Sequence, residues 1–220
     1  KAVEPLRALV RADAPAAVRL SALAALDGLN GTDERTLLLA IRDRHPAIRR
    51  HAIRISEPYL NETPNLADTL LRRLDDPDPK VRLQIAFSLG QWDDPRAGRA
   101  LAELAARNVD DLFIVAAVLS SAMRRPQELL NGVLDQGALG ESHLILVGNL
   151  LRIAYESGND AMLARGLQRI AASDQPEPAR QVARLLRELG EKVGETVDLA
   201  TLSEGSAVFV DQVQGSHRLV

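Results

Sequence analysis

Three short segments of the chain carry an acidic and a basic side chain at one spacing, with Asp six residues before Arg. The pairs are Asp13 and Arg19, Asp43 and Arg49, and Asp76 and Arg82. Such a series is either a charged binding strip or a ladder of ion pairs between neighbouring turns of a repeated structure. In a stack, an Arg at a fixed position can reach the turn Asp of its own or the next repeat, contributing about 1 kcal/mol or less if exposed. We favour the ladder and predict a structural role for these six residues.

The residue types needed for catalysis or metal binding do not converge in the sequence. His45, His51, His143 and His217 are scattered, and no two have the i,i+4 spacing that places two ligands on one helical face. Cys is absent, which excludes disulfides, thiolate ligands and Cys nucleophiles. The pair at residues 120–121, two Ser, lacks a Gly-x-Ser-x-Gly context, and no phosphate-binding Gly motif is present. We therefore predict no catalytic residue, no metal, no cofactor and no enzyme activity.

Five Arg side chains fall between residues 42 and 54, namely Arg42, Arg44, Arg49, Arg50 and Arg54. Such a cluster can form a basic patch for phosphate or for an acidic partner. The formal net charge is −3, however, and Lys occurs only at positions 1, 80 and 192. A DNA-binding array is expected to be Lys-rich and net positive. We predict no nucleic-acid partner and keep nucleic-acid binding through this cluster as an alternative.

The charged segments are expected to be turns, each of which opens a helix. A Pro lies between the two charges, and Pro is tolerated in the first helical turn. Apolar residues then recur at helical spacing, as in Val18, Ala22, Leu23 and Leu26. An earlier helix is predicted before each turn, over residues 4–12, 34–44, 65–75 and 95–107, with Asn65 and Asp94 as N-caps. Gly90 is predicted to end a helix in the left-handed conformation, and Trp92 to staple the turn after it.

The first three copies align without gaps and are 30 and 33 residues apart, and a fourth copy is predicted after them. It continues the apolar positions from Leu112 through Ala116, Ala117 and Ser120, with Arg107 in place of the Asp and Phe113 in place of the Arg. Two more pairs are predicted, at 126–136 with 141–157 and at 160–172 with 177–189, closed by Gly137, Gly158 and Gly190. Helices of about 12 residues are unstable alone and must bury their apolar faces against neighbours. The sequence predicts an all-α fold: a right-handed α-solenoid of about six helix pairs over residues 1–190, with a short irregular tail over residues 191–220.

The turn Asp, the apolar residue before the Arg and the small residues after it resemble HEAT repeats, including the type found in phycobilin lyases. The stretch Arg82-Leu-Gln-Ile-Ala-Phe-Ser-Leu-Gly-Gln-Trp-Asp-Asp-Pro-Arg-Ala97, continued over residues 111–121, is similar to one group of HEAT proteins. His51-Ala-Ile-Arg-Ile-Ser-Glu57 resembles the same group one repeat earlier. These are large secreted bacterial proteins, typical of planctomycetes, known as membrane-bound dehydrogenases, which join a β-propeller, a HEAT array and a c-type haem domain. The resemblance implies a fragment of a secreted dehydrogenase-like protein, periplasmic or extracellular.

The last residues carry a motif related to the start of that haem domain, Gly-x-x-Val/Leu-Phe-x-x-x-Cys-x-x-Cys-His-x-Leu. Gly, Val, Phe, His and Leu fall in register over residues 205–219, but Val213 and Ser216 occupy the two Cys positions. Covalent haem needs both thiols, so none is expected, and His217 would be the haem ligand only in an intact domain. Two readings stay open: a truncated haem domain that begins here, or a tail that only caps the stack.

These observations favour a non-catalytic scaffold that binds a protein partner or the neighbouring domains of its parent chain. The second helices are expected to line a concave face, and we select recurring positions outside the core as candidate contacts: His51, Arg54, Gln84 and Ser88. A lyase or glycosylase built on HEAT repeats is the enzyme alternative, but it needs an aromatic platform, and the chain has only two Tyr, three Phe and one Trp. No apolar run reaches the roughly 18–20 residues that span a bilayer, so direct membrane insertion is not expected.

Overall fold

The computed structural model describes residues 1–136, 140–171, 197–203 and 206–213. The chain divides into two compact units, Lys1–Gly132 and Val133–Val220. The first contains all of the charged turn segments and therefore the candidate site.

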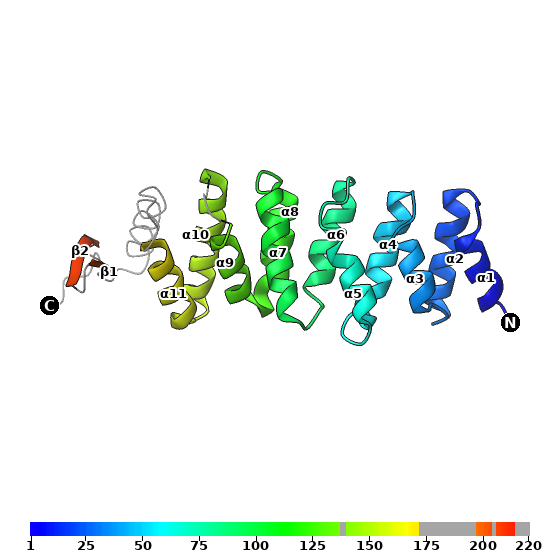
Figure 1. Ribbon diagram of the computed structural model, residues 1–220, viewed down its shortest axis with the longest axis horizontal. Coiled ribbons are helices and arrows are strands. Elements are labelled where there is room, and N and C mark those ends of the chain that lie inside the picture. The colour runs from blue at the N-terminus through cyan, green and yellow to red at the C-terminus, as the bar shows by residue number, and fades with distance from the viewer. Residues whose placement is uncertain (137–139, 172–196, 204–205, 214–220) are drawn as a thin grey trace. The chain divides into compact units, whose positions relative to one another are not determined.

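The first unit is a succession of helix pairs (Figure 1). The first helices of the four pairs are α1 (Val3–Arg11), α3 (Glu34–Ala40), α5 (Pro64–Leu71) and α7 (Pro95–Arg107). The second helices are α2 (Ala16–Gly28), α4 (Pro46–Ser56), α6 (Pro79–Leu89) and α8 (Leu112–Ser121). Two short 3₁₀ helices, η1 (Glu57–Tyr59) and η2 (Ala122–Arg124), follow α4 and α8. The unit ends within α9 (Pro126–Leu134).

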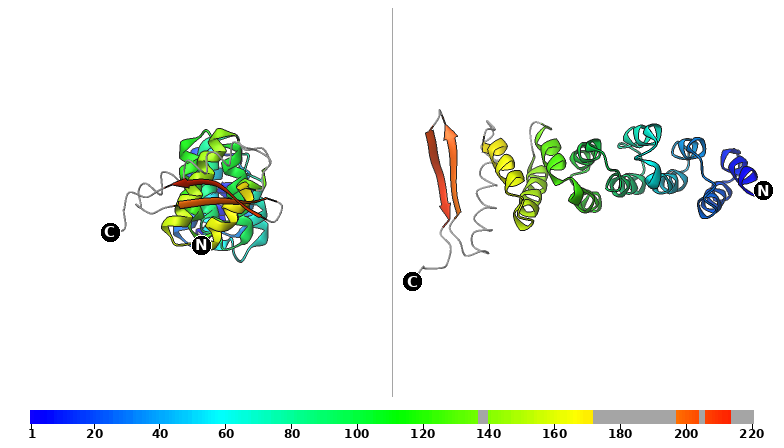
Figure 2. Two further views of the ribbon diagram at one scale, coloured as in Figure 1. Left: turned by 90° about the vertical axis from the view of Figure 1, so that its left-hand side faces the viewer. Right: turned by 90° about the horizontal axis from the view of Figure 1, so that it is seen from below.

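The helices of the first unit form two layers (Figure 2). α2, α4, α6 and α8 pack one against the next in one layer, and α1, α3 and α5 do so in the other. The core lies between the layers, where Leu23, Ile53, Leu70 and Ile85 are fully buried. Each such side chain contributes about 1.5–3 kcal/mol by leaving water. Because each helix pair packs against the next, the fold is the predicted α-solenoid.

Side-chain caps and Pro residues fix where the helices begin. Asp33, Asp78, Asp94 and Asp111 are N-caps whose carboxylates accept backbone N–H groups of the first turn. The prediction for Asp94 and α7 is thereby confirmed. The prediction for Asn65 is wrong: α5 begins at Pro64, after Thr63, because Pro fits the first helical position. Asn65 instead donates from Nδ2 to Glu34 Oε1 at 2.8 Å.

The first helices α3 and α5 end four residues earlier than predicted. After Ala40, the chain tightens through hydrogen bonds from Arg42 N to Leu39 O (3.0 Å) and from Asp43 N to Ala40 O (3.1 Å). These bonds are of the 3₁₀ type, which satisfies the last carbonyls of a helix in a shorter turn. The tightened turn brings the ladder Asp close to the start of the following helix.

The glycine caps behave differently from one another. Gly158 closes α10, as predicted, and its φ of +66° makes this a left-handed cap. Gly90 follows α6 with φ −66°, so the predicted left-handed conformation is wrong there. The need for glycine at position 90 is spatial: an added Cβ would lie 2.8 Å from the Cβ of Ser121, so α6 and α8 approach closely at this point. Asn30, with φ 50°, supplies the left-handed cap after α2.

The fourth helix pair is displaced by two residues from its predicted alignment. Thr63, the N-cap of α5, lies 15 residues before Asp78, the N-cap of α6, whereas Asp94 lies 17 residues before Asp111. The matching ladder positions are therefore Val109 for the Asp and Val115 for the Arg. The predicted positions, Arg107 and Phe113, are wrong by two residues.

Burial agrees with the displaced register. Ile114 and Val118 are buried in α8, as Val81 and Ile85 are in α6. Leu112, predicted as a core position, is 80 % exposed, and the predicted positions Ala116 and Ser120 are not buried either. In the first pair, Val18 is likewise 40 % exposed rather than buried.

The second unit contains α10 (Glu141–Glu156), α11 (Asp160–Ala171) and an antiparallel hairpin of β1 (Val197–Ser203) and β2 (Ser206–Val213). In the hairpin Val197 pairs with Val213, and an irregularity lies between Leu199 and Ala200. The sequence predicted an irregular tail here. The predicted helix 177–189 and the residues Gly137, Gly190, Gly205, Ser216 and His217 lie outside the described residues.

Among the described helices, none is long and apolar enough to cross a membrane.

Candidate functional site

The three ladder arginines share one position, four residues after the N-cap of a second helix. Arg19 on α2 donates from Nε and Nη2 to both carboxylate oxygens of Asp43, at 2.9 and 2.8 Å, and from Nη1 to the carbonyl of Ala14. The Arg therefore binds the carboxylate of the next turn and a backbone oxygen of its own turn. Asp13, the Asp of its own turn, instead accepts from Arg44 at 2.7 Å at the exposed surface.

Arg49 on α4 repeats this arrangement one pair later. Its Nε and Nη2 donate to the two oxygens of Asp76 at 2.8 and 2.6 Å, and its Nη1 donates to the carbonyls of Asp43 and Arg44. The side chain of Asp76 is fully buried and that of Arg49 is 8 % exposed. A bidentate, buried pair of this kind fixes the spacing of two turns far better than an exposed pair does.

The first rung of the ladder, the ion pair of Arg19 with Asp43, shifts the pKa values of both residues. Burial alone would raise the pKa of Asp43, but hydrogen bonds from Arg19 and from the His45 N–H outweigh burial, so its pKa lies below the ordinary value. The hydrogen bond to Asp43 raises the pKa of Arg19 above its ordinary value. Both groups are therefore held in their charged forms.

Arg82 on α6 has the same backbone contacts but no carboxylate. Its Nη1 donates to the carbonyl of Asp76 at 2.7 Å, within its own turn. Its Nε is buried and has no hydrogen-bond partner among the described residues. The position in the next turn that would carry the accepting Asp is Val109. Within the first unit, the ladder therefore has two complete rungs, and Arg82 stands where a third would be.

Two of the candidate contact residues are used inside the fold. Oε1 of Glu57 accepts hydrogen bonds from Ser88 Oγ at 2.6 Å and from Gln84 Nε2 at 3.1 Å. Ser88 is fully buried, and the three residues join η1 to α6. Sequence reasoning missed Glu57, because nothing in the repeat marks it as the acceptor.

The other two candidates lie on α4. Arg54 is half exposed and pairs with Asp27 at 2.8 Å. The Nε2 atom of His51 is buried without a hydrogen-bond partner among the described residues. Burial first, and then the positive charges of Arg54 and Arg50, lower the pKa of His51, so its ring is neutral at pH 7.

Four of the five arginines in the N-terminal cluster make contacts within the fold, and the fifth, Arg50, is exposed. Arg49 belongs to the ladder, Arg44 pairs with Asp13, and Arg54 pairs with Asp27. Arg42 reaches Thr69 Oγ1 at 3.4 Å. These arginines belong to the second helix pair, and their contacts reach residues of the first and third pairs.

Trp92 lies in the turn between α6 and α7 and is 3 % exposed. The guanidinium carbon of Arg96 lies 4.7 Å from the centre of its ring, a cation–π distance. Arg96 also binds Asp94 at 2.9 Å and Asp68 at 3.2 Å. Trp92 thus packs between repeats, with Arg96 linking its turn to α5.

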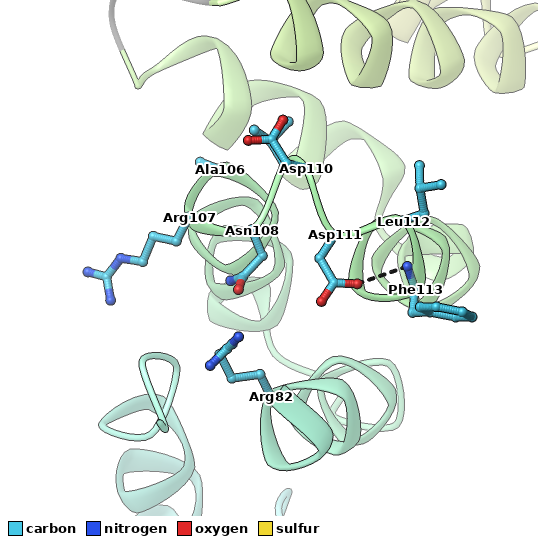
Figure 3. Close-up of a pocket in the computed structure, with 9 residues that line it drawn as sticks. Arg82, Ala106, Arg107, Asn108, Asp110, Asp111, Leu112 and Phe113 are labelled. Atoms are coloured by element: carbon cyan, nitrogen blue, oxygen red, sulfur yellow. Dashed lines mark hydrogen bonds between the residues drawn. The ribbon is translucent and has the colours of Figure 1, made fainter. Parts of the chain in front are cut away.

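A pocket of about 720 Å³ opens beside Arg82 and the turn before α8 (Figure 3). Leu112 and Phe113 lie at its edge, each 80 % exposed. Two adjacent large apolar side chains with this exposure form a surface suited to contact with another molecule. The sequence signal that could have located them is the Asp111 cap, which sets Ile114 rather than Leu112 as the first buried position.

The family model for HEAT repeats matches residues 34–122. These residues are HEAT repeats. The match covers α3 to α8, the same part of the chain that holds the acceptors of both complete rungs and the pocket. No curated protein matches the chain. HEAT repeats are commonly scaffolds for protein interactions and are typically not enzymes.

Proposed function

We propose that this HEAT array is a non-catalytic scaffold that binds a protein partner through the surface around the start of α8. The observation that carries the proposal is the exposed pair Leu112 and Phe113 beside the pocket of about 720 Å³. Exposed apolar side chains stabilise an interface when a partner removes them from water, at about 25 cal/mol per Å². The packed helices beneath them hold this surface in one shape, which lowers the entropy cost of binding.

The contact residues selected from the sequence take a smaller part in this proposal. Gln84 and Ser88 bind Glu57, so they support α6 rather than face a partner. Arg54 is half exposed and, with His51 beside it, can contribute a secondary contact on α4. The proposal includes no nucleic-acid partner, because three arginines of the N-terminal cluster are paired with Asp residues in different directions and the formal net charge is −3.

The proposal extends to the larger protein to which the array would belong. The resemblance of residues 82–97 and 111–121 to the propeller, HEAT and haem proteins supports an array that holds neighbouring domains of a secreted dehydrogenase-like chain. The exposed pair lies within the second of these stretches. The partner of the surface would then be a neighbouring domain of that chain or a protein that docks on it.

The experiment compares capture of proteins from a lysate of the source organism by three forms of the purified chain. The double variant Leu112→Ser, Phe113→Ser removes the apolar pair, and Phe87→Ser, at a side chain 45 % exposed on α6, is the control. Proteins retained by the native chain and the control, lost with the double variant and reproduced with the purified partner, support the proposal. Equal retention by all three forms places binding elsewhere, and no retention above an empty resin contradicts a scaffold role.

A further inference from the structure

Arg82 is held in the same way as the two arginines that bind a carboxylate. In Arg19, Arg49 and Arg82 alike, Nη1 donates to a carbonyl of the Arg's own turn. This contact orients the guanidinium group so that its Nε and Nη2 edge faces the next turn. In the first two cases that edge binds both oxygens of an Asp. In the third case the edge is prepared for a carboxylate that the next turn does not supply.

The missing acceptor follows from one residue. Asp43 and Asp76 each lie two residues before the N-cap of a second helix, and Val109 lies two residues before the N-cap Asp111. The Val side chain has no polar atom, and Arg82 Nε stays buried without a hydrogen-bond partner among the described residues. A buried donor without an acceptor is unfavourable, and an acceptor placed against it would relieve that cost.

The surroundings of Arg82 favour one carboxylate rather than a polyanion. The guanidinium group points toward the turn that carries Asn108 and Asp111 (Figure 3). Arg107 also lines the pocket and pairs with Glu103 at 2.5 Å. Asp110 and Asp111 line it as well, and Asp111 accepts the N–H groups of Phe113 and Ile114. These two carboxylates would repel a doubly charged phosphate or a nucleic acid more strongly than a single carboxylate.

We propose that the pocket beside Arg82 binds an Asp or Glu side chain of a protein partner, while an apolar side chain next to it packs on Leu112 and Phe113. The forked Nε and Nη2 edge matches the two oxygens of a carboxylate, as it does in the two complete rungs. The partner's carboxylate takes the place of the Asp absent at position 109. This inference rests on the proposed scaffold function and names the chemistry that the surface recognises.

The probe is N-acetyl-aspartyl-leucinamide, which carries one carboxylate and one apolar side chain, and N-acetyl-asparaginyl-leucinamide is its uncharged control. The Nε–H resonance of Arg82 is followed by NMR during titration, with the resonance of Arg49, which is bound to Asp76, as an internal control. We expect a saturable shift of Arg82 with a dissociation constant on the order of 1–30 mM, a range suited to so small a ligand. We expect no shift of Arg49 and none with the asparaginyl control.

Val109→Asp provides the matched variant, because it supplies the carboxylate from within the chain and leaves Arg82 in place. We expect the Arg82 resonance of this variant to be shifted already and at least a tenfold loss of probe affinity, whereas Val109→Asn retains the probe. No saturable shift in the native chain, equal shifts of several arginines, or undiminished binding by Val109→Asp would each overturn the proposal.

Two further comparisons distinguish a carboxylate ligand from a phosphate ligand, and failure of the carboxylate site from failure of the scaffold function. Tighter binding of inorganic phosphate, or of a single-stranded oligonucleotide, that is lost in Val109→Asp would replace the carboxylate by a phosphate ligand and overturn the proposal. If the probe fails but the Leu112→Ser, Phe113→Ser variant still loses a captured partner, the scaffold function stands and only the carboxylate site is wrong. If the captured partner is lost in Val109→Asp as well, both are supported.

Discussion

Arg49 and Asp76 form a two-pronged ion pair across consecutive turns, with Nε to Oδ2 at 2.8 Å and Nη2 to Oδ1 at 2.6 Å, and both side chains are withdrawn from water. The remaining Arg49 nitrogen is held by the carbonyls of Asp43 and Arg44. Such a pair is weak as a net source of stability compared with apolar packing, but it is costly to break from one side. Arg49 and Asp76 therefore specify how two consecutive helix pairs pack against each other.

Replacing Arg49 by Ala is expected to lower the free energy of unfolding by about 3–5 kcal/mol, because Asp76 would stay buried without its counter-charge. The control is Arg54→Ala, which breaks the half-exposed pair with Asp27 and should cost about 0.2–1 kcal/mol. Urea unfolding followed by circular dichroism measures both. Similar losses in the two variants would mean that burial of the ladder has no energetic consequence.

Acid is expected to weaken the first rung. The folded-state pKa of Asp43 lies below its ordinary value, so its contribution to stability is complete above the unfolded pKa of about 3.9 and is lost as the pH falls through the folded value. Asp33 and Asp94 shift in the same direction and add to the effect. Asp43→Asn should be less stable than the native chain at pH 7, and the difference should shrink below pH 4. Unfolding curves between pH 2 and 7 test this, and a difference that stays constant with pH contradicts it.

Adding the absent acid at position 109 should extend the ladder. In Val109→Asp we expect a gain of about 1 kcal/mol, or roughly 2–4 °C in Tm, because an unsatisfied donor gains a charged acceptor. The gain should disappear when Arg82 is replaced by Ala in the same chain, a coupling that a double-mutant cycle isolates. A gain that survives the loss of Arg82 would have another origin.

Replacing Gly98 by Ala is expected to lower the free energy of unfolding. A Cβ there would overlap the Cβ of Glu128, so Gly98→Ala should cost about 1–3 kcal/mol through overpacking between α7 and α9. Gly28, at the end of α2, is the control, because a Cβ added there would meet open space and Ala should add about 0.4–1 kcal/mol. Thermal melts of the two variants should move in opposite directions, and melts that move together would contradict the close approach.

Much of the fold was predictable because its signals are local. Pro at the first helical position and the Asp cap at position 94 mark helix starts, and apolar spacing marks the buried faces, so the helix pairs of the first unit follow from the sequence. The shortened ends of α3 and α5 were not predictable, because the 3₁₀ turn there serves the contact between Asp43 or Asp76 and the Arg of the preceding pair.

The site was less predictable, because its geometry depends on how pairs stack. The spacing of Asp and Arg shows that they are related, but only the stack decides that Arg19 binds Asp43 of the next turn rather than Asp13 of its own. The displaced register of α8 hid Val109 as the absent acceptor and made Leu112 look like a core residue. The Asp111 cap held that information, because the ladder Arg lies four residues after the N-cap in each complete rung.

The end of the ladder at Arg82 has a mechanical consequence. From α2 to α6 each turn is tied to the next by a short two-point link, so the edge that carries the turns resists both stretching and shear. Between α6 and α8 that tie is absent, and the two helices are held together by their packing, which includes the close approach of Gly90 to Ser121. Bending of the array is therefore expected to concentrate between α6 and α8. A carboxylate bound to Arg82 would restore a link there and make the array stiffer.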